Sequence, residues 1–150
     1  MQTYFTDLNV VYSFKNLDNK RLAGQRRELC QLVNYLLLHP DRTGSYANHT
    51  VVRMWRGYES YLVKVYMKQI ITEWENRGYN NIKILEYYND CIKLVKNKPV
   101  IRPEWLDEEM ITMFKSKLIS KNPEYYQKLW PDVPSDIEFI WPVAELSKKN

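Results

Sequence analysis

The sequence has few of the features that mark secreted, membrane-spanning or metal-bound proteins. Its two cysteines, Cys30 and Cys91, lie in apolar stretches with helical periodicity, so we expect two buried free thiols rather than a disulfide. The first residues, MQTYFTDLNVVYSF, lack the basic segment and apolar run of a secretory signal. The longest apolar run, around Tyr35 to Leu38, is too short to span a membrane. We therefore expect a soluble intracellular protein, in the cytoplasm, the nucleoid or an infected host cell, that does not bind membranes.

The chain also lacks CxxC and HExxH patterns, internal repeats, low-complexity segments and a convincing pair of strands. We accordingly expect no metal and no cofactor. A chain of 150 residues is typical of one domain, here residues 1–150, and buries roughly two-thirds of its unfolded surface. The absence of strands predicts an all-α fold with three to four main helices and an extended aromatic C-terminal tail.

Capping residues, apolar periodicity, glycine and proline set the expected helix boundaries. Residues 1–15 are expected to be irregular or briefly extended, and the last segment, WPDVPSDIEFIWPV, to be an extended tail packed on the surface. The predicted helices run from Asp18 to about His39 before Pro40, from Asn48 or Thr50 to Arg77 before Gly78, from Asn81 to Lys96, from Asp107 to about Ser120, and from Asn122-Pro123 to Leu129.

Two charged residues fall inside the apolar faces of the first two predicted helices. The predicted core faces are Leu22, Leu29, Val33, Leu36 and Leu37 on the first helix, and Val52, Trp55, Leu62, Tyr66 and Ile70 on the second. Arg26 and Glu59 lie within these faces on a helical wheel. Because a buried lone charge is very costly, we predict that they form a structural ion pair between the two helices, the alternative being that each reaches solvent.

Positive charge is concentrated in one part of the chain. The formal net charge is only +4, but residues 15–56 contain eight Lys or Arg against the three acids Asp18, Glu28 and Asp41. A local positive field favours phosphate binding, although an ordinary solvated helix face explains the charge equally well.

One flank of the first predicted helix combines this charge with an acid. Arg21, Glu28 and Tyr35 recur every seven residues, and Gly24 lies beside them. A glycine inside a helix costs about 1 kcal/mol against alanine, which close approach of DNA or of the chain's own N-terminal segment would justify. Glu28 is then within reach of a sugar-phosphate, unless it is a surface acid paired with Arg21 or Lys20.

The stretch LDNKRLAGQRREL resembles the first helix of the pyrimidine-dimer DNA glycosylases, the phage-type endonuclease V family, in which Arg-Glu-Leu follows a polar and basic turn, here Arg27-Glu28-Leu29. The segment TEWENRGY is similar to the end of the family's second helix. NHTVVRMWRGYE and the tail YYQKLWPDVP…FIWPV resemble a cellular branch of the family. The resemblance covers about Leu17 to Tyr79 and the tail, and residues 80–120 match poorly.

This resemblance implies a monomeric DNA repair enzyme that acts on double-stranded DNA as a glycosylase and abasic-site lyase. In the family the N-terminal α-amine attacks C1′ of an ultraviolet pyrimidine dimer or a related lesion, and a Schiff base forms before the strand is cut. An α-amine with a pKa near 8 is partly unprotonated at neutral pH. By the match, Glu28 is the acid/base carboxylate, Arg27 contacts the DNA backbone, and Arg21 stands where the family has a histidine.

The nucleophile is the departure from the family pattern. The family exposes its amine by removing the initiator Met before a small residue, whereas here residue 2 is the bulky Gln2. Either Met1 supplies the amine, or the nucleophile is displaced to a lysine such as Lys15 or Lys20, or the lyase step is lost.

Further residues are candidates for DNA binding. The basic and capping candidates are Lys20, Arg21, Arg27, Asn48, His49, Arg53 and Arg56, and the tail candidates are Tyr125, Lys128 and Trp130. For Asn48 and His49 the alternative is a capping or incidental loop role, and for the tail it is packing against the first helix. The competing functions are a non-catalytic DNA-binding protein of the same fold and an interaction protein that docks an acidic partner.

Overall fold

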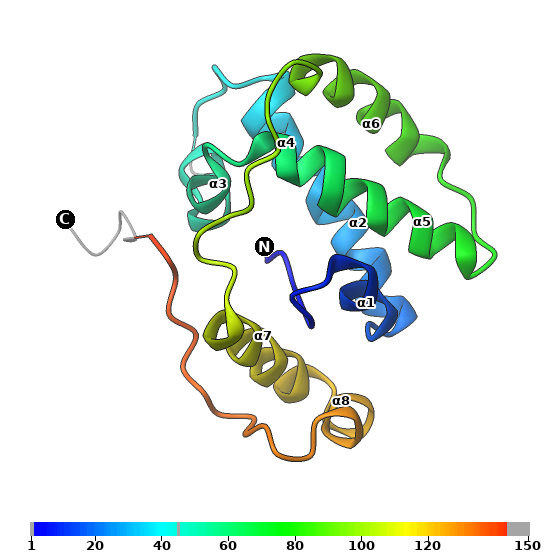
Figure 1. The fold of residues 1–150 in the computed structure, drawn as a ribbon, viewed down its shortest axis with the longest axis vertical. Coiled ribbons are helices and arrows are strands. Elements are labelled where there is room, and N and C mark those ends of the chain that lie inside the picture. The colour runs from blue at the N-terminus through cyan, green and yellow to red at the C-terminus, as the bar shows by residue number, and fades with distance from the viewer. Residues whose placement is uncertain (1, 45, 144–150) are drawn as a thin grey trace.

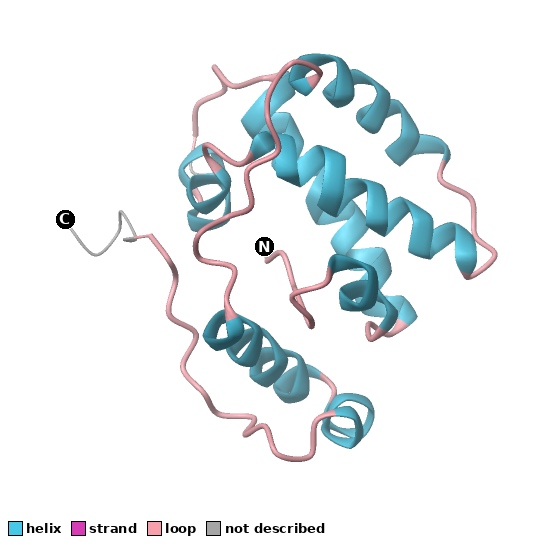
Figure 2. Cartoon of the chain, in the orientation of Figure 1, coloured by secondary structure: helices cyan, strands magenta, loops and turns pink. Residues whose placement is uncertain are grey.

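Helices make up all the regular structure in residues 2–44 and 46–143, which the computed structural model describes (Figures 1 and 2). The all-α prediction is therefore confirmed over these residues. Within them, no helix is both long and apolar enough to cross a membrane. The elements are α1 (Val10–Lys15), α2 (Asn19–Val33), the π-helical η1 (Asn34–Leu38), the 3-10 turn η2 (Tyr46–Asn48), α3 (Thr50–Trp55), α4 (Glu59–Tyr61), the π-helical η3 (Leu62–Met67), α5 (Lys68–Asn76), α6 (Ile82–Val95), α7 (Glu108–Lys121) and α8 (Pro123–Leu129).

The first predicted helix is present as α2 and its continuation η1, which ends before Pro40. Four of its five predicted core residues, Leu22, Leu29, Val33 and Leu36, are buried, and Leu37 is half-buried. Asp18 occupies the N-cap position, but its side chain makes no capping bond. Its carboxylate instead accepts a hydrogen bond from the Tyr126 hydroxyl, which ties α8 to the start of α2.

The second predicted helix is wrong as a single element, because the chain breaks it between Trp55 and Glu59. Gly57 has a φ of 91°, a left-handed conformation that favours glycine, and its N–H donates to both Glu59 carboxylate oxygens at 3.0 and 3.1 Å. The helical path resumes through α4, η3 and α5, and Gly78, with a φ of 89°, follows its end as predicted. The predicted stripe is still fully buried: Val52, Trp55, Leu62, Tyr66 and Ile70.

The remaining helices follow their sequence signals closely. The Asp107 carboxylate accepts from the Met110 N–H at 2.8 Å and caps α7, and Asn122 caps α8 in the same way at 3.4 Å. The tail after α8 is extended, but it runs along α7 rather than along α2 (Figure 1). The Ile137 N–H donates to Ser116 Oγ at 3.0 Å, and the Phe139 ring lies 5.2 Å from Phe114.

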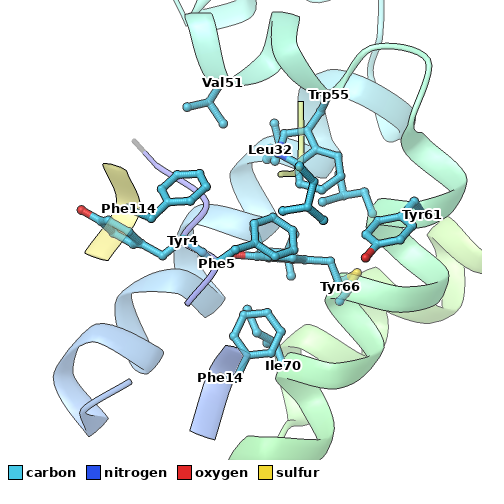
Figure 3. Packing of buried hydrophobic residues seen from close by; sticks show 14 of the residues in the cluster. Tyr4, Phe5, Phe14, Leu32, Val51, Trp55, Tyr61, Tyr66, Ile70 and Phe114 are labelled. Atoms are coloured by element: carbon cyan, nitrogen blue, oxygen red, sulfur yellow. The ribbon is translucent and has the colours of Figure 1, made fainter. Parts of the chain in front are cut away.

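The N-terminal segment is the largest departure from the predicted fold. Residues 2–9 have no regular structure, as the sequence predicts, but residues 2–6 are buried and residues 10–15 form α1 instead of irregular chain. Phe5 lies at the centre of the aromatic core, with its ring 4.9 Å from Tyr66 and 6.1 Å from Phe114 of α7 (Figure 3). The segment enters the middle of the molecule between α7 and the α1–α2 pair (Figure 1). Because it fills that space, the start of the chain is held in place by the core.

The predicted ion pair between Arg26 and Glu59 does not form. Arg26 Nη2 donates to Asn81 Oδ1 at 2.9 Å, and its guanidinium lies 4.4 Å from the centre of the Trp74 ring. The Glu59 carboxylate instead accepts hydrogen bonds from the Gly57 N–H. Arg26 therefore has an aromatic partner, Trp74 on α5, and a polar partner, Asn81 at the start of α6, neither of which the helical wheel revealed.

The two cysteines are free thiols, as predicted, although only Cys91 is fully buried and Cys30 is half-buried. Burial raises the pKa of Cys91 to about 12, so this thiol is protonated and unreactive at neutral pH.

Candidate functional site

A polar pocket of about 430 Å³ opens where α2, α7, the chain start and the C-terminal tail meet. Five cationic side chains and one carboxylate line it, together with aromatic and amide groups. The lining residues are Gln2, Tyr4, Lys20, Arg21, Gly24, Gln25, Arg27, Glu28, His49, Lys117, Lys121 and Trp141. This mixture predicts a site for an anionic ligand with one general acid or base.

Helical periodicity explains the contribution of α2. Lys20, Gly24 and Arg27 are spaced by three or four residues, as are Arg21 and Glu28 through Gly24, so they share one face of the helix. Two members of the predicted flank, Arg21 and Glu28, therefore line the pocket, whereas Tyr35 does not and packs against Tyr46 with ring centres 4.8 Å apart. Gly24 leaves the wall open, because a Cβ added there would meet only the Arg27 Nη2 atom, at 3.8 Å. The chain's own N-terminal segment therefore does not require this glycine.

Glu28 is half-buried in the pocket, and no Lys or Arg among the described residues forms an ion pair with it. The only ion pair among residues 2–44 and 46–143 joins Arg77 and Glu73, at 2.9 Å. The alternative in which Glu28 pairs with Arg21 or Lys20 is therefore wrong. Its carboxylate lines the pocket together with five Lys and Arg side chains, so a ligand bound there meets one acid among several cations.

The start of the chain reaches the same pocket. Gln2 and Tyr4 line it, and Gln25 holds both of them through their backbones, with Nε2 donating to the Gln2 carbonyl at 2.8 Å and Oε1 accepting from the Tyr4 N–H at 2.9 Å. Met1, the predicted nucleophile, lies outside the described residues. Burial raises the pKa of the Tyr4 phenol to about 12, with smaller opposing effects of Arg21, which lowers it, and Glu28, which raises it. This phenol is therefore a neutral hydrogen-bond donor at neutral pH.

Six pocket residues were not predicted from the sequence: Gln2, Tyr4 and Gln25 around the chain start, and Lys117, Lys121 and Trp141 from α7 and the tail. Lys117 and Lys121 are spaced by four on α7 and form the wall facing α2. Their spacing at the end of a predicted helix was the available signal, but nothing in the sequence places α7 opposite α2. Trp141 belongs to the tail, and its ring lies 6.3 Å from His49 in an edge-to-face arrangement.

The segment before α3 contributes one of its two predicted residues. His49 lines the pocket and is also the N-cap of α3, since its Nδ1 accepts from the Val51 N–H at 3.1 Å. The prediction that Asn48 or Thr50 caps this helix is wrong. Asn48 is exposed in η2, away from the residues that line the pocket.

The other predicted contacts lie outside the pocket. Arg56 Nη2 donates to the Ala47 carbonyl at 3.3 Å, and Arg53 also makes contacts of its own. Trp130 stacks on Tyr126 with ring centres 5.5 Å apart, and the Lys115 ammonium lies 5.3 Å from the centre of the Trp130 ring. The remaining predicted tail residues, Tyr125 and Lys128, are on α8 and are exposed, outside the pocket.

No group of three or more His, Cys, Asp or Glu side chains arranged to hold a metal ion occurs within the described part of the chain.

One comparison with known proteins gives a match, and it covers many of the residues that line this pocket. A family model described as pyrimidine dimer DNA glycosylase matches residues 1–87, more than half of the chain. The match includes the chain start, α2 and His49. Searches of curated proteins and of solved structures found no match.

Proposed function

The chain belongs to the pyrimidine dimer DNA glycosylase family, and we propose that its pocket excises ultraviolet pyrimidine dimers or a related lesion from double-stranded DNA and then cuts the abasic strand. The observation that carries this proposal is the convergence of the chain start, Glu28 and five cations on one pocket. The cations suit the phosphates on either side of a lesion.

The proposed chemistry uses the α-amine of Met1, which follows the family resemblance and is supported by the position of Gln2 in the pocket. The amine lone pair forms a bond to C1′ while the glycosidic bond breaks. The base leaves with the electron pair of the glycosidic bond and takes up a proton. The nitrogen then loses a proton, its lone pair forms the C=N bond as the C1′–O4′ bond breaks, and O4′ takes up a proton, which gives the protonated Schiff base. Loss of a C2′ proton then expels the 3′ phosphate.

Glu28 has two tasks in this sequence. As a carboxylate it stabilises the positive charge that develops on the sugar, and it accepts and returns protons during the ring opening and elimination steps. Arg21, Arg27 and Lys20 on α2, and Lys117 and Lys121 on α7, bind phosphates from two sides.

Borohydride trapping tests the proposal. Incubating the protein and borohydride with duplex DNA that carries either a pyrimidine dimer or an abasic site should give a covalent adduct on the Met1 peptide, identified by mass spectrometry. Glu28→Gln should reduce trapping by 10²-fold or more, in the range expected for a general acid–base group. The matched control Glu86→Gln, on the exposed side of α6, should trap normally.

The outcome also separates the alternatives. An adduct on Lys20, Lys117 or Lys121 moves the nucleophile to a lysine of the pocket; Lys15 does not line the pocket, and its ammonium lies 5.5 Å from the Tyr12 ring centre. DNA binding without any adduct refutes the lyase proposal and favours a non-catalytic binding protein. Absence of DNA binding even at low salt leaves the acidic-partner alternative.

A further inference from the structure

Gln25 is a buried polar residue on a helix whose inward face is otherwise mostly apolar. Its side chain is only 4 % exposed. A buried amide costs free energy unless its donors and acceptor are used, and a leucine would fill the same position without that cost. Its hydrogen-bond partners therefore indicate what it does.

The hydrogen-bond partners of Gln25 are two backbone groups of the chain start and the hydroxyl of Tyr66. Nε2 donates to the Gln2 carbonyl at 2.8 Å, and Oε1 accepts from the Tyr4 N–H and the Tyr66 hydroxyl, both at 2.9 Å. A backbone carbonyl can only accept and a backbone N–H can only donate, so these partners fix which end of the amide faces which residue. The side chain thus fastens the backbone on both sides of Thr3.

Gln25 and Glu28 are three residues apart on α2, so they are neighbours on the helix surface. One rigid turn of helix therefore carries both the carboxylate of the pocket and the attachment point of the chain start. The first residues of most proteins are poorly ordered unless something ties them down. Here the tie comes from the same turn of helix as the acid.

We propose that Gln25 is a positioning residue that holds the chain start, and through it the reacting amine, in a fixed place beside Glu28. The proposal rests on the function proposed above, because it requires the nucleophile to be at the chain start. It assigns Gln25 no contact with the substrate. Its effect is on the geometry of attack, where a displacement of about 1 Å costs roughly 10²-fold in rate.

The test measures the rate of adduct formation separately from DNA binding. Gln25→Met keeps the length of the side chain but removes both bonds to the chain start. We expect its single-turnover rate of borohydride-trapped adduct formation on abasic duplex to fall about 10- to 100-fold. Its Kd for a duplex with a reduced, uncleavable abasic site should change less than about threefold, because the cations that bind phosphate are untouched.

Tyr126→Phe is the matched control for lost stability. It removes two hydrogen bonds between α8 and Asp18, one to the carboxylate and one from the backbone N–H, and neither residue lines the pocket. This variant should form the adduct at the wild-type rate even if it is less stable than Gln25→Met. If Gln25→Met does not fold, Gln25→Asn replaces it, because its amide is one methylene too short to reach both backbone groups.

The outcomes separate this inference from the proposed function. A folded Gln25 variant with the wild-type rate, or one whose rate loss is matched by Tyr126→Phe or by an equal loss of DNA affinity, overturns the positioning role while the proposed function stands. If the wild-type protein forms no adduct, or forms it on a lysine, the proposed amine fails and the inference fails with it.

Discussion

Replacing Gly24 with alanine should make the protein more stable and a weaker DNA binder. Gly24 lies inside α2, its φ is not positive, and an added Cβ meets only the end of the flexible Arg27 side chain, at 3.8 Å. Alanine is therefore accommodated without strain. The gain in helix propensity is about 1 kcal/mol, and in a chain of this size it raises Tm by roughly 2–4 °C.

The loss of DNA binding follows from the position of Gly24 in the pocket wall between Lys20 and Arg27. If a sugar-phosphate lies against the bare Cα, a methyl group there must displace it. Extra volume in a close contact costs about 1–3 kcal/mol, which corresponds to a five- to 150-fold weaker Kd. Denaturant unfolding and fluorescence anisotropy on a damaged duplex measure the two effects independently.

Gly57→Ala is the contrasting control. Gly57 has a φ of 91° and lies outside the pocket, so alanine should destabilise the protein by about 1–2 kcal/mol and leave DNA affinity unchanged. If Gly24→Ala lowers the free energy of unfolding, the space beside the Gly24 Cα is too small for a methyl group. If Gly24→Ala is more stable and binds DNA normally, DNA does not approach this face of α2 closely.

Three further predictions follow from individual contacts. Tyr126→Phe should lower the free energy of unfolding by about 1.5–3 kcal/mol, because the Asp18 carboxylate loses its phenol donor; an unchanged urea midpoint would contradict this. The double substitution Lys117→Ala and Lys121→Ala should reduce the slope of log Kd against log salt by up to about 2 for duplex DNA, measured by anisotropy, whereas an unchanged slope would remove α7 from the interface. The pKa of Tyr4 is raised by burial from 10.0 to about 12, so its share of stability is complete below pH 10 and is lost as the pH rises towards 12. The free energy of unfolding should fall by up to about 3 kcal/mol over this pH range. Tyr4→Phe should flatten the fall when unfolding is measured between pH 10 and 12.

Helical periodicity predicted that Arg21 and Glu28 share one flank of α2, and both line the pocket. Lys20, Arg21, Arg27 and Glu28 lie together in the pocket because residues three, four and seven apart share a helix face whatever the rest of the fold does. For the same reason the buried stripe from Val52 to Ile70 was predicted correctly.

The break at Gly57 could not be predicted from that stripe. Trp55 and Leu62 are seven residues apart, a spacing that fits one continuous helix, and both are buried although the helix is interrupted between them. A glycine inside a helical pattern is tolerated often enough that it does not by itself predict a break. The capping of the Gly57 N–H by Glu59 becomes clear only from the backbone geometry.

The burial of the chain start depended on partners that are distant in sequence. Nothing in the pattern of residues 2–6 indicates a core segment, because its ties are to Gln25, Ser13, Trp55 and Tyr66. The misplaced partner of Arg26 has the same cause. A helical wheel shows that a charged side chain points inward, but not which residues it meets. Here these residues are Trp74 and Asn81.

The pocket combines two parts of the chain with different relationships to the family. The match to the family covers residues 1–87 and so includes the chain start, Glu28 and the cations of α2. The opposite wall, formed by Lys117, Lys121 and Trp141, lies beyond the matched residues. If the chemistry resides in the matched part, the pocket still has walls from both parts. The size and charge of the ligand that fits then depend on α7 and the tail as well as on α2. We therefore expect substitutions in the opposite wall to change which damaged duplex is bound, through Kd, while the rate of the chemical step in a bound complex depends on Glu28 and the chain start.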